Sequence, residues 1–193
     1  MKRWQNIVLG LVGAGLVLFG IGFALPSTAH VERDITIDAP PADVYALISD
    51  FNQWGQWSPW ASIDPEAQMT ITGTGLGQTM AWASDNPQVG QGQQEIIELE
   101  RDRLLKTHLE FEGQGVADAT FELTPTVTDT DGIVTNSTQV VWSLDSSISE
   151  DAPFIFKPLN NYLGLLLDSL VGKDYETGLA NLKQIAENFF PAS

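Results

Sequence analysis

The sequence predicts one α+β domain behind an apolar N-terminal helix, with an antiparallel sheet and a long C-terminal helix. Three observations support this prediction. Uncharged apolar residues run from Ile7 to Leu25, strand-like segments separated by turn sequences follow one another between residues 68 and 145, and the C-terminal segment has an apolar stripe at helical spacing. Alternation of apolar and polar residues is typical of strands, and a period near 3.6 is typical of helices. A chain of 193 residues has room for one domain and a short leader.

Composition and charge exclude several classes of function. Hydrophobic residues make up 43% of the chain, so it can build a sizeable core. The formal net charge is -16, and such a surface repels nucleic-acid phosphate, so we expect no nucleic-acid partner. The absence of cysteine excludes disulfides, a thiolate nucleophile and zinc–thiolate sites. With two histidines, the chain is expected to hold no metal and no cofactor.

The first 29 residues are interpreted as a membrane anchor or a signal peptide. The apolar run from Ile7 to Leu25 spans about 28 Å as a helix, close to the hydrocarbon thickness of a bilayer. Its length favours an uncleaved anchor, whereas its glycines and the small residues Ser27 and Ala29 fit a signal peptide cleaved near Ala29. Because positive charge precedes the run, we expect a single-pass bacterial inner-membrane protein whose domain faces the periplasm. The alternative is a secreted or periplasmic domain after cleavage.

Residues 30–193 are predicted to form the domain, which opens with a strand and a short helix. Residues from His30 to Asp38 alternate and predict the strand, which ends at a proline pair. Pro41 can open a helix, and Asp43 in its first turn complements the helix dipole.

The middle of the domain is predicted to be an antiparallel meander of six strands. Short turn sequences rich in glycine, aspartate and asparagine separate them. Alternation is clear where Leu105, Thr107, Leu109 and Phe111 share one face. The expected strands are Gln68–Thr72, Gln78–Ser84, Gln88–Leu99, Leu104–Glu112, Val116–Pro125 and Val134–Asp145.

The end of the chain is predicted to be helical. An apolar stretch from Tyr162 to Val171 is followed, after Gly172, by a helical stripe that starts at Tyr175. Asp174 is interpreted as a first-turn carboxylate of the helix that follows Gly172. The sheet must bury one face, and this helix is the only large element available to cover it.

Three segments resemble a known superfamily. They are Val31 to Pro40, Asp50 to Trp60 and Gly172 to Lys183, in that order along the chain. Together they resemble the START-like superfamily, also called SRPBCC or the polyketide cyclase/dehydrase and lipid-transport group, in a membrane-anchored bacterial branch. The resemblance implies a helix-grip fold, in which a curved seven-stranded antiparallel sheet wraps around the C-terminal helix and leaves a cavity. It also implies binding of a lipid or another hydrophobic small molecule in many members, and catalysis in some.

Candidate ligand-binding residues are aromatic and apolar side chains expected near that cavity. Trp54, Trp57 and Trp60 recur every three residues and either line a cavity mouth or clamp short helices onto the sheet. Thr107 is the one polar group expected on the inward face, where its hydroxyl needs a partner. The full set is Trp54, Trp57, Trp60, Met80, Trp82, Thr107, Phe111, Trp142, Leu166 and Tyr175.

Three functions remain open from the sequence. The first is non-catalytic binding, possibly with transport or sensing, of a hydrophobic or amphipathic small molecule on the periplasmic side of the membrane. The second is a polyketide cyclase or dehydratase-like enzyme, for which Tyr162 and Tyr175 are the best candidates, although we assign no catalytic residue. The third is a protein-interaction module with a collapsed cavity, in which Leu163 to Leu167 dock onto a partner.

Overall fold

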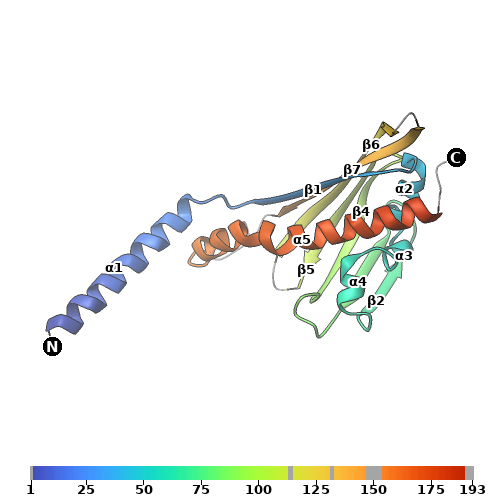
Figure 1. The fold of residues 1–193 in the computed structure, drawn as a ribbon. Coiled ribbons are helices and arrows are strands. Elements are labelled where there is room, and N and C mark those ends of the chain that lie inside the picture. The colour runs from blue at the N-terminus through green and yellow to red at the C-terminus, as the bar shows by residue number, and fades with distance from the viewer. Residues whose placement is uncertain (1, 113–114, 131–132, 147–153, 190–193) are drawn as a thin grey trace.

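A computed structural model describes residues 2–112, 115–130, 133–146 and 154–189, and it has the helix-grip fold (Figure 1). Seven antiparallel strands form one sheet in the order β1-β7-β6-β5-β4-β3-β2. The strands are β1 (Ala29–Ile37), β2 (Gln68–Thr72), β3 (Thr79–Ala83), β4 (Gln91–Glu100), β5 (Leu104–Phe111), β6 (Gly115–Thr130) and β7 (Ile133–Ser146). The helices are α1 (Lys2–Ala24), α2 (Pro41–Ile48), α3 (Phe51–Trp54), α4 (Pro59–Ile63) and α5 (Lys157–Phe189).

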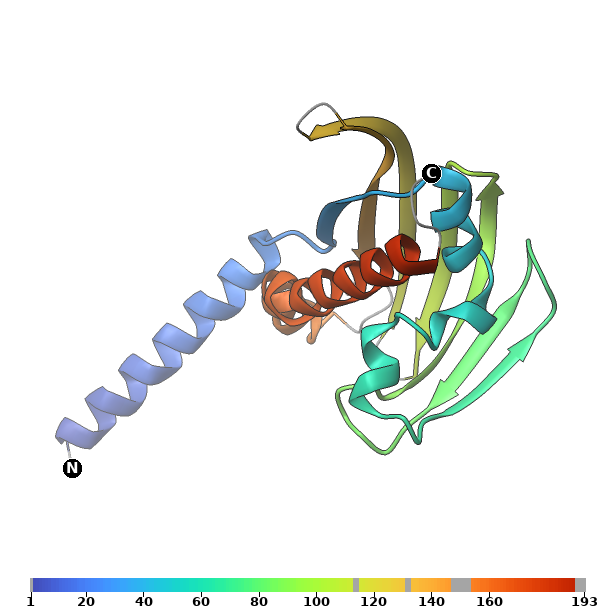
Figure 2. The same cartoon turned by 45° about the vertical axis from the view of Figure 1, so that its right-hand side comes forward.

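The N-terminal helix α1 projects away from the domain, as Figures 1 and 2 show from two directions. Residues Trp4–Ala24 are long and apolar enough to cross a membrane, with a mean hydropathy of 2.4. Only 6% of this segment is buried against the rest of the chain. A core helix would be mostly buried, so α1 is not part of the domain core.

The strand ends agree with the sequence prediction to within one residue, except that β4 begins at Gln91 rather than Gln88 and that the hairpin of β6 and β7 is longer. Their pairing continues to Thr130 opposite Ile133, whereas the predicted strands end at Pro125 and begin again at Val134. Residues 131–132 lie outside the described residues. The two strands are longer than predicted because the Thr-rich segment after Pro125 has strand propensity.

The segment between β1 and β2 forms three short helices, with Gly55 at the end of α3 and Pro59 at the start of α4. Pro41 and Pro59 occupy first-turn positions, where the missing N–H costs nothing. Asp50 caps α3 by accepting the backbone N–H of Asn52 at 3.0 Å. These helices and α5 lie on the same face of the sheet (Figure 2).

The long helix α5 continues through Gly172, so the expectation that Asp174 lies in a first turn is wrong. Gly172 has a packing role instead, because a methyl group there would collide with the guanidinium of Arg33. That guanidinium pairs with Asp168 on one side of Gly172 and with Glu176 on the other, both at 2.8 Å. The absence of a side chain at Gly172 therefore leaves room for the Arg33 side chain of β1 to lie across α5.

Packing between α5 and the sheet creates a specific test at Gly178. A methyl group at Gly178 would lie 2.9 Å from the Trp142 ring and 3.0 Å from Pro59 Cδ. We expect Gly178→Ala to lower the free energy of unfolding by about 1–3 kcal/mol, because overpacking a close-packed core forces its neighbours to move. Urea unfolding followed by circular dichroism measures this change.

Gly55→Ala is the matched control. Gly55 has a right-handed helical backbone, and nothing lies within 4 Å of the added methyl group. We expect a change within about 0.5 kcal/mol. Equal effects of the two substitutions would contradict the packing described here.

Candidate functional site

The inward face of the sheet can be read from its pairing register. Thr107 of β5 stands opposite Ile96 and Ala119, and the row continues through Leu144 to Val31. All five residues are buried. Side chains on this face therefore point toward α5 and the short helices.

An aromatic stack occupies the space between the sheet and α5. Phe121 of β6 and Trp142 of β7 are stacked with ring centroids 4.6 Å apart, and Tyr175 of α5 covers the other face of Trp142 at 3.7 Å. Trp57 meets Phe121 and Trp142 edge-on at 5.9 and 5.7 Å. We call these four residues the central aromatic stack. It joins two strands, α5 and the segment between α3 and α4.

Of the tryptophans Trp54, Trp57 and Trp60, the first two have a structural role and the third is partly exposed to solvent. The indole N–H groups of Trp54 and Trp57 donate to the backbone carbonyls of Ile48 and Leu47, at 2.8 and 3.1 Å. Both rings are buried, so they hold α2 against the following segment. Trp60 is half-buried and meets Trp142 and Tyr175 edge-on. Of the three, Trp60 alone borders both the stack and the solvent.

Within the part of the chain that the structure describes, two buried polar atoms on inward-facing side chains have no hydrogen-bond partner. They are Oγ1 of Thr107 and Nε1 of Trp142. Buried polar groups in native structures are usually hydrogen-bonded, and each exception asks for an explanation. The Thr107 hydroxyl can donate and accept a hydrogen bond, and the Trp142 indole N–H can donate one, to a bound molecule or to water.

Beyond the stack, the inward face is only partly covered. Ile71, Trp82, Leu109 and Phe111 point inward by register and are half-buried. We call these four residues the open inner face. The Trp82 ring meets Phe111 edge-on at 5.8 Å and lies across Gly92, where a methyl group would be 2.6 Å from the ring.

Sequence reasoning missed one polar residue beside the open inner face. Gln94 is buried and stands in the row of Met80 and Leu109. Gln94 lies two residues before the apolar Ile96, and this alternation could have predicted that Gln94 faces inward. Met80, which lies two residues before Trp82 on the same face of β3, is also buried.

Between Met80 and Leu123, the described side chains that face inward from β3, β4, β5 and β6 are uncharged. They are Met80, Trp82, Gly92, Gln94, Ile96, Leu99, Leu105, Thr107, Leu109, Phe111, Ala117, Ala119, Phe121 and Leu123. The one ionisable group in the central aromatic stack is Tyr175. Burial raises the pKa of its phenol far above the ordinary value, and the Asp145 carboxylate adds to that shift. Tyr175 therefore stays protonated near neutral pH and cannot serve there as a general base.

Other proposed site residues lie elsewhere. Leu166 is exposed on α5, apart from the inward-facing group. Tyr162 also lies outside the interior, where its hydroxyl donates to the backbone carbonyl of Leu18 at 2.7 Å. His108 lies on the outward face and pairs with Asp118 at 2.7 Å, as a surface histidine would. The side chain of Leu163 lies outside the described residues.

Two hollows on the described surface are open to solvent. One follows the start of α1, from Trp4 to Leu9, and the other lies beside β5 and β6, from Glu122 to Pro125. The space between α5 and the middle of the sheet is filled by the central aromatic stack. Access to the unpartnered atoms therefore requires side chains to move.

The chain belongs to the polyketide cyclase/dehydrase and lipid transport family, whose sequence profile matches residues 28–187. This membership supports binding of a hydrophobic molecule or a cyclase-like function. No curated protein sequence is significantly similar to the chain.

Solved structures share the fold. A START superfamily protein from Mycobacterium smegmatis superposes with a TM-score of 0.56 at 16% identity, over 83% of this chain and 98% of that one. The ZhuI aromatase/cyclase from Streptomyces sp. R1128 gives a TM-score of 0.56 at 17% identity, over 83% and 94% of the two chains. Norcoclaurine synthase from Thalictrum flavum gives 0.55 at 13% identity, over 84% and 96%. At these identities the likeness shows the fold alone.

The unpartnered hydroxyl of Thr107 gives a direct test of the interior. Valine matches threonine in shape but has no hydroxyl to desolvate, so we expect Thr107→Val to raise the free energy of unfolding of the ligand-free protein by about 1 kcal/mol. Urea unfolding measures the change. The control is Thr120→Val on the outward face of β6, where we expect a change within about 0.5 kcal/mol. Destabilisation by Thr107→Val would show that the hydroxyl already has a partner.

Proposed function

We propose that the chain binds a hydrophobic or amphipathic small molecule of the lipid class without catalysing a reaction. The observation that carries this proposal is the open inner face, whose Leu109 lies two residues along β5 from the buried, unpartnered hydroxyl of Thr107. Half-buried aromatic rings offer apolar area, and a few polar atoms orient a ligand, which is the usual composition of a small-molecule site. The ten candidate residues are narrowed to Trp60, Met80, Trp82, Thr107, Phe111 and Trp142, with Leu109 and Gln94 added.

The proposal places the protein at a membrane. Residues 1–29 act as a single-pass anchor, and residues 30–193 form the ligand-binding domain on the periplasmic side of a bacterial inner membrane. The length and hydropathy of Trp4–Ala24 support the anchor. The charges of Lys2 and Arg3 before the span support the orientation.

Binding without catalysis is favoured over a cyclase-like reaction by the chemistry of the inward face. Proton transfer in a cyclisation or dehydration needs a group with a pKa near the working pH. The inward-facing residues of β3–β6 supply uncharged side chains, and Tyr175 is held protonated. The fold shared with ZhuI does not change this, because one fold hosts many functions.

A second candidate is a protein-interaction module with a collapsed interior. The observation that favours it is the close packing of the central aromatic stack, in which Trp142 lies between Phe121 and Tyr175. If that packing does not open, the interior is purely structural. The two candidates differ in one measurable property, namely whether the purified protein retains an apolar compound.

The test is organic extraction and mass spectrometry of the full chain purified in mild detergent. We expect a stoichiometric apolar compound that is absent from a detergent blank. A protein that carries none, and that takes up no fluorescent fatty acid, would support the interaction module instead.

Substitutions on the open inner face are expected to release the retained compound. Trp82→Ala and Phe111→Ala each remove a ring that would contact the ligand, so we expect occupancy at a fixed ligand concentration to fall, with a loss of affinity of about tenfold. Leu76→Ala is the control, since Leu76 is an exposed leucine in the turn before β3. Equal retention by all three variants would place the ligand elsewhere.

A further inference from the structure

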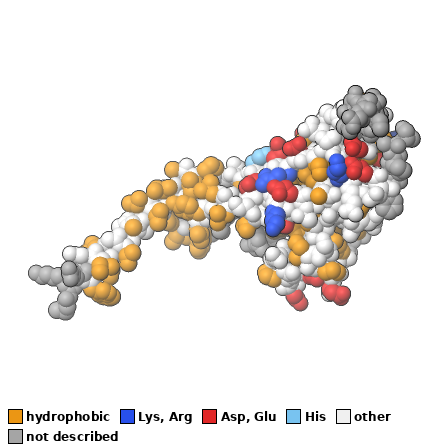
Figure 3. All heavy atoms as spheres, in the orientation of Figure 1, with side chains coloured by type: hydrophobic (Ala, Val, Ile, Leu, Met, Phe, Trp, Pro, Cys, Tyr) orange, Lys and Arg blue, Asp and Glu red, His pale blue; other side chains and the backbone are white. Residues whose placement is uncertain are grey.

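The turn before α5 and the start of that helix expose large apolar side chains. Phe154, Ile155 and Phe156 are 71%, 63% and 53% exposed, and Leu159 and Leu166 are 58% and 54% exposed. Contiguous apolar surface of this kind on a soluble domain usually marks an interaction site. In Figure 3, apolar side chains lie along much of α1 and gather where this helix meets the domain.

Contacts with α1 fix the level of this segment along the N-terminal helix. Asn161 donates through Nδ2 to the carbonyls of Gly22 and Leu25, at 2.9 and 3.2 Å. The ring of Phe154 stacks on that of Phe23 with centroids 4.6 Å apart. The Tyr162 hydroxyl reaches the Leu18 carbonyl, about 9 Å below the end of α1 at ~1.5 Å per residue. The start of α5 therefore lies beside the last two turns of α1.

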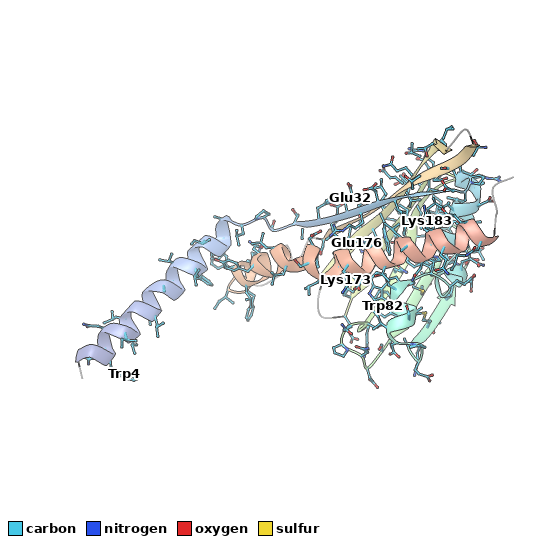
Figure 4. The ribbon with its side chains drawn as sticks, in the orientation of Figure 1. Trp4, Glu32, Trp82, Lys173, Glu176 and Lys183 are labelled. Carbon is cyan, nitrogen blue, oxygen red and sulfur yellow. The ribbon has the colours of Figure 1, made fainter. Side chains whose placement is uncertain are left out.

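The charge pattern agrees with an apolar environment. From Phe154 to Leu167 the sequence has one charged residue, Lys157, whose long side chain can reach an interface while its stem stays in an apolar layer. At about 100° per residue, Leu159 and Leu166 fall on the side of α5 opposite Asp168, the residue that pairs with Arg33 of β1. The apolar stripe therefore faces away from the sheet. Figure 4 shows the charged residues Lys173, Glu176 and Lys183 further along the helix.

We propose that Phe154–Phe156 and the first turns of α5 insert into the bilayer leaflet on the domain's side, where acyl chains cover Ile155, Leu159 and Leu166. This inference rests on the proposed membrane anchor. If Trp4–Ala24 crosses the bilayer, residues level with Leu18 to Ala24 lie in its outer part, and exposed apolar side chains there meet lipid. The domain is then held at the membrane by two segments, and α5 connects the lipid phase to the central aromatic stack through Tyr175.

The natural absence of cysteine makes a clean test possible. Single-cysteine variants Ile155→Cys and Leu159→Cys of the full chain are labelled with a nitroxide in nanodiscs of phosphatidylcholine. A zwitterionic lipid is chosen because the net charge of -16 disfavours anionic head groups. Val12→Cys in the middle of α1 and Ala180→Cys, exposed further along α5, are the controls. Collision with oxygen reports lipid, and collision with a water-soluble nickel chelate reports solvent.

We expect the labels at residues 155 and 159 to favour oxygen over the nickel chelate by at least about tenfold relative to Ala180→Cys, and to resemble Val12→Cys. Both substituted side chains are exposed, so the variants are expected to fold, which circular dichroism checks. Labels at 155 and 159 that resemble Ala180→Cys, with Val12→Cys still in lipid, would overturn this inference and leave the anchor intact. A solvent-exposed label at residue 12 would overturn the anchor itself.

Discussion

The stacking of Trp142 between Phe121 and Tyr175 is the interaction on which the rest of this structure depends. It joins two neighbouring strands to α5, and Trp57 adds the connection to the short helices. Aromatic pairs of this kind add about 0.5–1.5 kcal/mol each beyond the area that they bury. Because the stack fills the middle of the fold, α5 and the sheet are held at a fixed separation there. Toward β2, β3 and the nearby end of β5, the inward-facing apolar surface stays half-open.

This arrangement explains how a helix-grip domain can be closely packed and still suit an apolar ligand. A ligand that lies on Trp82 and Phe111 needs little rearrangement, whereas one that reaches the hydroxyl of Thr107 or the N–H of Trp142 must displace neighbouring rings. The ion pairs of Arg33 across Gly172 hold the edge strand β1 to α5 on the opposite side of the fold. The half-open end of the sheet lies away from the Arg33 ion pairs. These pairs therefore oppose movement of β2 and β3 least. The start of α5, beside α1, lies toward the bilayer in the proposed arrangement.

Much of the fold was predictable, because alternation, turn sequences and helical stripes are local signals. Alternation fails locally in β4, where a bulge between Ile96 and Glu98 shifts the register. The outward-facing Glu95 and Glu98 therefore fall three residues apart, which a strict period of two does not predict. Inward positions such as Thr107 followed from alternation alone. What could not be predicted depends on contacts distant in sequence. Gly172 is needed because the Arg33 side chain of β1 lies across it. The position of Tyr162 beside α1 is set by its hydrogen bond to the Leu18 carbonyl.

The most direct test of the central claim is photocrosslinking of the full chain in nanodiscs that contain a lipid with a photoactivatable acyl chain, followed by peptide mapping. The claim is that an apolar ligand lies on the open inner face. It predicts crosslinks in the peptides that contain Trp82 and Phe111, and competition by the compound extracted from the purified protein. Crosslinks confined to α1 and the start of α5, with none in β3 or β5, would contradict the claim and indicate a domain whose interior is closed to lipid.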